Sequence, residues 1–167
     1  FVRGKVIEAL NGYKFNGVDV PIFDERVIID PQKPLPVING AQTYIMLQDQ
    51  QMIYNAVQTY CNPRFNISLT IKVITIFTKQ GAKKLSEDIG DGIINLLRTD
   101  RDGSKLDGID KIELVTSRSV NEITTERTAF SKIFILNFIK NGWLKNKNIT
   151  LKFTIMANTN VKGAQGI

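Results

Sequence analysis

The chain has 167 residues, a formal net charge of +6, 43% hydrophobic residues and 23% charged residues, a composition typical of an ordinary globular domain. It has one cysteine and no histidine, so an internal disulfide, a Ser-His-Asp or Cys-His triad and a histidine-based zinc site are excluded within it. The longest nearly unbroken apolar run, residues 133–139, is far shorter than the roughly 20 residues of a membrane helix. It predicts a buried strand.

The N-terminal segment predicts a helix followed by an edge strand. Apolar side chains recur every four residues up to Leu10, and Asn11 and Gly12 provide a stop. Residues 18–24 then alternate loosely. Because Pro21 lacks a backbone N–H, we expect this strand to lie at a sheet edge or to begin after the proline.

Residues 30–36 contain three prolines, which predict a stiff, extended loop. Such a loop loses little entropy when it binds a partner, and it makes Lys33 and Pro34 candidate contact residues. The alternative interpretation is a plain connector between two strands.

A strand is expected at residues 42–48, and residues 51–57 either extend it or pair with it. The longest strand follows at residues 66–78, where side chains alternate with a period of two. One of its faces carries Ile67, Leu69, Ile71, Val73 and Phe77.

A helix is predicted at about residues 82–98, and we expect it to cover that strand. Its apolar side chains fall within about 80° of one another at 100° per residue, and they are Ala82, Leu85, Ile89, Ile93 and Leu96. Gly92 lies at the margin of this face, where a close approach of helix and sheet would compensate for its low helix propensity. The alternative interpretation is that the helix simply tolerates this glycine.

Residues 99–110 alternate acidic residues with glycine, as calcium-binding loops do. In an alignment that starts at Asp100, however, Lys105 stands where the turn needs glycine and Lys111 where the ion needs glutamate. An exposed loop is therefore the better interpretation. Its basic residues Arg98, Arg101 and Lys105 are candidate contacts.

Two more strands are expected at residues 109–120 and 128–140, joined through residues 124–127. The second is apolar on both faces, which makes one face a candidate subunit contact. Residues 149–157 alternate again, with Phe153 on the apolar side, and either add to the sheet edge or reach another chain by strand addition.

These elements predict an α+β fold with a single mixed or antiparallel β-sheet. The sheet is packed by the N-terminal helix and the central helix, and the strand at 149–157 is an extra C-terminal strand. We expect residues 1–140 to form the α+β domain and residues 141–167 to form a C-terminal strand extension and tail.

This order resembles the tail-terminator, or tail-completion and head-to-tail joining, proteins of tailed bacteriophages. The similar segments are residues 18–24, 44–47, 65–77 running into 82–97, and 127–138. The segment from Trp143 onward departs from that family's minimal fold. It leaves open whether the chain is a terminator or a related ring protein of a short-tailed phage neck.

The resemblance implies a non-enzymatic virion protein without cofactor or metal, assembled in the host cytoplasm. Its subunits would form a closed ring, a hexamer or a dodecamer, with double-stranded DNA passing through the lumen and with portal, neck or tail proteins as neighbours, and no membrane. The residues expected near the lumen or a partner are Lys33, Pro34, Arg98, Arg101, Lys105, Trp143 and Phe153.

The competing hypothesis is a small basic α+β nucleic-acid-binding module. It rests on the net charge of +6 and on aromatic residues among basic ones, such as Tyr60, Arg64 and Phe65. An enzyme ranks third, because the sequence shows no cluster of polar residues expected to converge on one site.

Overall fold

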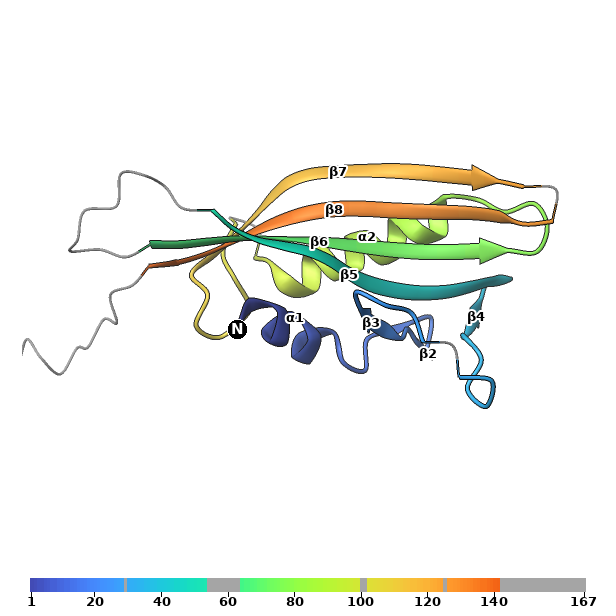
Figure 1. Cartoon of the computed structure of the whole chain (residues 1–167), viewed down its shortest axis with the longest axis horizontal. Helices are drawn as coiled ribbons and strands as arrows, with labels where there is room; N and C mark the ends of the chain where they lie inside the picture. Colours follow the sequence, from blue (N-terminus) through green and yellow to red (C-terminus); the bar gives the residue numbers. More distant parts are fainter. Residues whose placement is uncertain (29, 54–63, 100–101, 125, 142–167) are drawn as a thin grey trace, which may run out of the picture.

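The computed structural model describes residues 1–28, 30–53, 64–99, 102–124 and 126–141. These residues form an α+β fold in which a mixed, mostly antiparallel sheet has the strand order β3-β5-β6-β8-β7, with β4 added beside β5 (Figure 1). The sheet is not closed. The elements are α1 (Val2–Leu10), β1 (Lys14–Phe15), β2 (Val18–Asp19), β3 (Ile22–Asp24), β4 (Val37–Ile38), β5 (Ala41–Ile53), β6 (Arg64–Phe77), α2 (Lys84–Leu97), β7 (Lys111–Ile123) and β8 (Thr128–Asn141).

The predicted fold class is confirmed, with both helices and the long strands present. The extra C-terminal strand predicted at residues 149–157 lies outside the described residues, as does the rest of the extension that begins after Asn141. The division between a domain and an extension therefore stays a prediction.

Strand β6 is the centre of the sheet because both of its edges are paired along most of its length, one with β5 and the other with β8. The period of two in the sequence predicted its faces correctly. Leu69, Ile71, Val73 and Thr75 are fully buried on the side that faces the helices. Branched side chains suit this pleated, buried position.

Strand β5 is continuous up to Ile53, so residues 51–53 extend the strand predicted at 42–48 rather than pairing with it, and residues 54–57 of that prediction lie outside the described residues. The register shifts between Leu47 and Gln50, where a bulge bends the strand. At its outer edge, β3 begins immediately after Pro21, as the missing proline N–H predicted, and it runs parallel to β5.

Helix α2 packs on β6 and β8 through Leu85, Ile89, Ile93 and Leu97, all of which are buried. The prediction that Ala82 and Leu96 lie on this face is wrong. The helix begins at Lys84, after Ala82, and Leu96 is 39% exposed. Leu97 follows Ile93 by four residues and packs on the sheet, whereas Leu96, which is about 100° from Leu97 around the helix axis, lies within the apolar arc but is left partly exposed at the end of the helix.

The two glycines of α2 have different neighbours. A Cβ at Gly90 would lie 2.9 Å from Cγ of Lys132 and 3.6 Å from Cε1 of Phe134, so this glycine permits the close approach of helix and sheet. A Cβ at Gly92 would instead collide with the hydroxyl of Tyr13. Of the two interpretations of Gly92, close approach to the sheet does not apply, since that role belongs to Gly90.

Strands β7 and β8 confirm the two predicted C-terminal strands and form a hairpin, in which the Thr124 N–H donates to the Arg127 carbonyl at 2.9 Å. Strand β8 is apolar on both faces, as predicted. Phe134, Leu136 and Phe138 point into the core, and the alternate residues point away from the helices.

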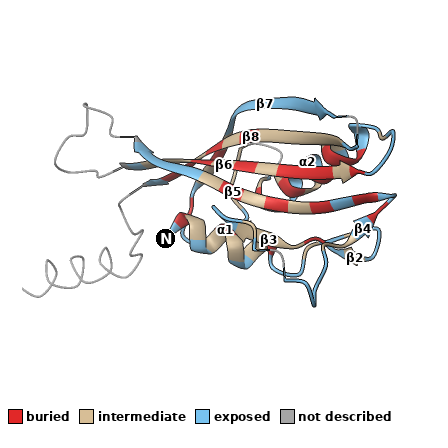
Figure 2. Cartoon of the chain, turned by 45° about the vertical axis from the view of Figure 1, so that its right-hand side comes forward, coloured by how far each residue is buried: buried red, intermediate tan, exposed pale blue. Residues whose placement is uncertain are grey.

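The core lies between the sheet and both helices (Figure 2). Val2, Val6 and Leu10 of α1 are buried in the same cluster as the apolar face of α2. Both helices therefore cover one side of the sheet, and Figure 1 looks onto the other side, with α2 behind the strands.

The positions of Leu96 and Leu97 give a direct test of the helix orientation. Leu97→Ala should lower the free energy of unfolding by about 2–5 kcal/mol, because it leaves a cavity in the core. Leu96→Ala should lower it by less than about 1 kcal/mol, because the side chain is already partly in water. Urea denaturation followed by circular dichroism measures both, and equal losses would contradict this helix orientation.

Candidate functional site

The side of the sheet that points away from the helices, which we call the open face, carries apolar side chains on four strands, with Thr70 and Lys72 of β6 among them. Its apolar side chains are Phe23 of β3, Tyr44 and Met46 of β5, Ile74 and Ile76 of β6, and Ile133 and Ile135 of β8. Ile74 is buried among its neighbours and the others are half-buried. Among the described residues, no helix lies over this face (Figure 1).

Tyr44 gives the open face a polar group within an apolar surround. Its ring meets the ring of Phe23 edge to face, with 5.8 Å between the ring centroids. Burial raises the pKa of the Tyr44 phenol, and the positive charge of Arg127 partly opposes that rise. The phenol therefore stays neutral at physiological pH and can act as a hydrogen-bond donor.

Two amide side chains on the open face have unsatisfied acceptors. The Oδ1 atoms of Asn66 and Asn137 are buried and have no hydrogen-bond partner among the described residues. Asn66 pairs with Ile139 and Asn137 with Ser68, so the two amides are diagonal neighbours on β6 and β8. An unsatisfied buried acceptor costs about 1–3 kcal/mol, and donors from a covering partner would remove that cost.

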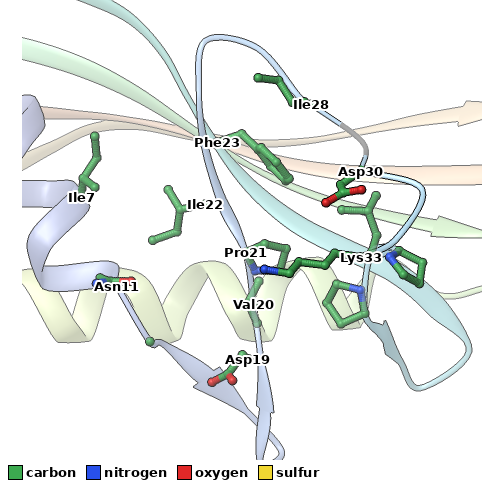
Figure 3. A pocket seen from close by; sticks show the side chains of 14 residues that line it. Ile7, Asn11, Asp19, Val20, Pro21, Ile22, Phe23, Ile28, Asp30 and Lys33 are labelled. Carbon is green, nitrogen blue, oxygen red and sulfur yellow. The ribbon is translucent and has the colours of Figure 1, made fainter.

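The predicted proline-rich loop connects β3 to β4 and forms one wall of a cavity of about 590 Å³ (Figure 3). The other walls come from the end of α1 and from the chain between β2 and β3. Lys33 and Pro34 both line it, and the Lys33 side chain points across the cavity toward Pro21. The Asp30 carbonyl accepts the Lys33 N–H at 2.9 Å, which fixes the turn.

The basic residues Arg98 and Lys105 hold the loop after α2 against the end of that helix. Arg98 forms an ion pair with Asp102, and its side chain is only 18% exposed. The Lys105 ammonium donates to the Asn95 carbonyl at 2.7 Å, and the Lys105 N–H donates to the Leu97 carbonyl at 2.9 Å. Lys105 thus satisfies two carbonyls at the helix C-terminus and Arg98 pairs within the loop, so both side chains contact the domain itself.

The structure does not bring the predicted contact residues into one site. The proline-rich loop joins β4 at the end of the sheet where Ala41 pairs with Phe77. The loop with Arg98 and Lys105 lies at the opposite end, where Gly103 bridges to Lys111. A strand as long as β6 spans roughly 45 Å. Arg101, Trp143 and Phe153 lie outside the described residues.

A second apolar groove, of about 260 Å³, lies at the end of the sheet where β8 finishes. Phe1, Met52, Phe65 and Phe138 line it, and the Lys140 ammonium lies 4.7 Å above the centre of the Phe1 ring. This groove was not predicted from the sequence. Its residues come from four elements or termini, and no local pattern predicts that they meet.

Six of the 17 basic side chains among the described residues form ion pairs with acidic ones. Ion pairs join Arg3 to Asp24 and Glu25, and further pairs are Lys5–Glu8, Lys14–Asp19, Lys83–Glu87, Arg98–Asp102 and Lys111–Glu113. Residues 142–167 contain four lysines and no acidic residue. This signal in the sequence was overlooked, and it places most of the net charge in the C-terminal segment.

No protein-family model and no curated protein sequence matches the chain. Of the helices within the described ranges, none has the length and apolar character needed to cross a membrane. Those same ranges contain no group of three His, Cys, Asp or Glu side chains placed to hold a metal ion.

The different roles of Arg98 and Lys33 can be measured. Arg98→Gln should lower the free energy of unfolding by about 1 kcal/mol, because Asp102 loses a charged hydrogen-bond donor. Lys33→Gln should change it by less than about 0.5 kcal/mol, because Lys33 is exposed and has no ion pair with the described residues. Urea unfolding of the two variants gives both values. An equal effect of the two substitutions would contradict the structural role of Arg98.

Proposed function

We propose that the chain is a structural virion protein of a tailed phage. In this proposal it is a ring-forming tail terminator or a neck connector subunit through which DNA passes. Its partners are further copies of itself and neighbouring portal, neck or tail proteins, and it works without catalysis, cofactor or metal. The proposal rests on the resemblance of the sequence to tail-terminator proteins together with the surfaces of the fold.

The observation that carries the proposal is the open face of the sheet. A monomer normally covers both sides of a sheet that is apolar on both sides, but here both described helices pack on one side. On the other side, Ile74 lies beside Tyr44, and Lys72 of β6 separates Met46 from Ile133, so the apolar side chains surround one lysine. Apolar surface of this kind is typical of protein–protein contacts.

A ring also needs two different surfaces on each subunit, because copies in a ring meet head to tail. The open face is one, and the cavity under the proline-rich loop is a second that lies on a different part of the domain. The stiff loop is suited to receive a segment of a neighbour, since little of its entropy remains to be lost. The two surfaces support a closed assembly.

The test is to measure the mass of the full chain by native mass spectrometry and its shape by electron microscopy, alone and with a neighbouring virion protein. We expect a discrete ring. Ile135→Lys, which places a charge on the open face, should abolish the ring while the circular dichroism spectrum is retained. Leu96→Lys, on the exposed side of α2, is the matched control and should leave the ring intact.

A persistently monomeric chain in both settings would refute the proposal. A ring that forms equally well with Ile135→Lys would show that assembly does not use the open face.

The second candidate function is the small basic nucleic-acid-binding module, favoured by the four lysines and the absence of acidic residues in 142–167. A protein of this kind binds DNA or RNA with an affinity that falls steeply as salt rises, because phosphate contacts release counterions. Fluorescence anisotropy of a labelled duplex between 50 and 200 mM salt measures that slope. A weak, flat response, which we expect, would remove this candidate.

A further inference from the structure

The two edges of the sheet differ in how they are protected. At one edge β5 is flanked by β3 and β4, and beyond them the guanidinium of Arg3 donates to the carbonyls of Leu47 and Gln48 at 3.3 and 2.7 Å. At the other edge lies β7, whose first residues are covered by the bridge from Gly103 and by the hydrogen bond from the Ile112 N–H to the Asp102 carbonyl. Beyond that point no described strand pairs with the outer side of β7.

The hydrogen-bond phase of the hairpin shows which backbone groups of β7 face outward. The Thr124 N–H donates to the Arg127 carbonyl, so the even-numbered residues of the ladder, such as Val120 opposite Ser131, exchange hydrogen bonds with β8. The odd-numbered residues Ser117, Ser119, Asn121 and Ile123 therefore present their N–H and C=O groups to the open edge. Such a row is a template for another strand.

We propose that a second copy of this chain covers this edge, with β7 of one copy pairing antiparallel to β7 of the other about a two-fold axis at Val120. In this register Ser119 faces Asn121 of the second copy, and Ser117 faces its Ile123. These are outward-facing residues on both sides, so they exchange backbone hydrogen bonds. Val120 faces Val120 in a non-hydrogen-bonded pair, where side chains are closest.

Charge complementarity selects this register. The pairing places Arg118 opposite Glu122 of the second copy, and symmetry repeats the contact. Neither side chain has an ion-pair partner among the described residues, and both lie on the open face with Val120. A register centred on Arg118 would instead place the two arginines against each other, which is unfavourable.

The surroundings of β7 leave room for this contact. Helix α2 packs over β6 and β8 and reaches β7 through the hydrogen bond from the Ser119 hydroxyl to the Glu87 carboxylate at 2.9 Å. This bond is the main cause of the lowered pKa of Glu87. Val120 and Ile123 are 45% and 69% exposed, so pairing removes apolar surface from water.

Cysteine cross-linking tests the register. In the full chain with Cys61→Ser, Val120→Cys brings two thiols into a pair whose Cα atoms lie about 4.5 Å apart, within the range that a disulfide accepts. Oxidised glutathione should convert this variant into a covalent dimer, visible on a non-reducing gel. Arg118→Cys is the matched control and should stay monomeric on the gel. Any other pattern overturns the register.

Two further measurements test the edge by the mass of the native assembly. Asn121→Pro removes an outward N–H without touching the β8 ladder, as prolines at sheet edges do, and should halve the mass relative to wild type and to the control Asn121→Thr.

Arg118→Glu and Glu122→Arg should each weaken association about tenfold or more, and the double variant should restore it. A monomeric wild type, or a mass that none of these changes alters, overturns the proposal.

This pairing does not depend on the proposed ring. A ring is built from contacts between different surfaces, whereas the β7 contact joins identical surfaces. The β7 contact would therefore pair the subunits of one six-membered ring with those of another, which favours the dodecamer over the hexamer. Loss of the ring with Ile135→Lys while the Val120→Cys cross-link persists separates the two contacts. A covalent dimer without any ring would refute the ring and leave the edge pairing in place.

Discussion

The structure depends on the packing of both helices against the same face of one sheet. The fully buried residues Leu69, Ile71 and Val73 of β6 meet Ile89 and the rest of the α2 face in a single cluster. Once that cluster is filled, the described chain has no helix left for the other side of the sheet. Because β6 and β8 carry branched apolar side chains on both sides, the fold itself creates a surface that favours association.

The two edges of the sheet are protected to different degrees, which leaves one exposed edge beside the exposed face. Arg3 reaches from α1 to the outer side of β5, so the helix that fills the core also protects one edge. The other edge has no such element, and its exposed residues alternate charged and apolar on the open face. Arg118 and Glu122 reduce indiscriminate pairing of this edge and at the same time allow one register with a complementary copy. Stability of the monomer and specificity of contact are therefore encoded by different residues.

The sequence predicted the elements well because their patterns are local. The alternation in β6 and β8 identified the buried faces, and Pro21 located the start of β3. The error at Leu96 arose because the apolar arc of α2 includes both Leu96 and Leu97, and the contact with β6 and β8 selects between them. The contact residues were harder to predict, because the sequence shows the charges of Arg98 and Lys105 but not the groups that they contact. Their partners, Asp102 and the Asn95 carbonyl, are a consequence of how the loop folds back.

The distribution of charge bears on how a ring of this chain would treat DNA. A protein that grips DNA places unpaired lysines and arginines along its surface and gains affinity from counterion release. Among the described residues, 17 basic side chains are nearly balanced by 15 acidic ones, so the net charge of the domain offers a duplex little long-range attraction. A lumen lined by a surface of mixed charge would hold a duplex weakly, because its acidic side chains repel the phosphates that its basic ones attract. An overall positive charge is thus compatible with a conduit as long as acidic side chains balance the cations that face the duplex.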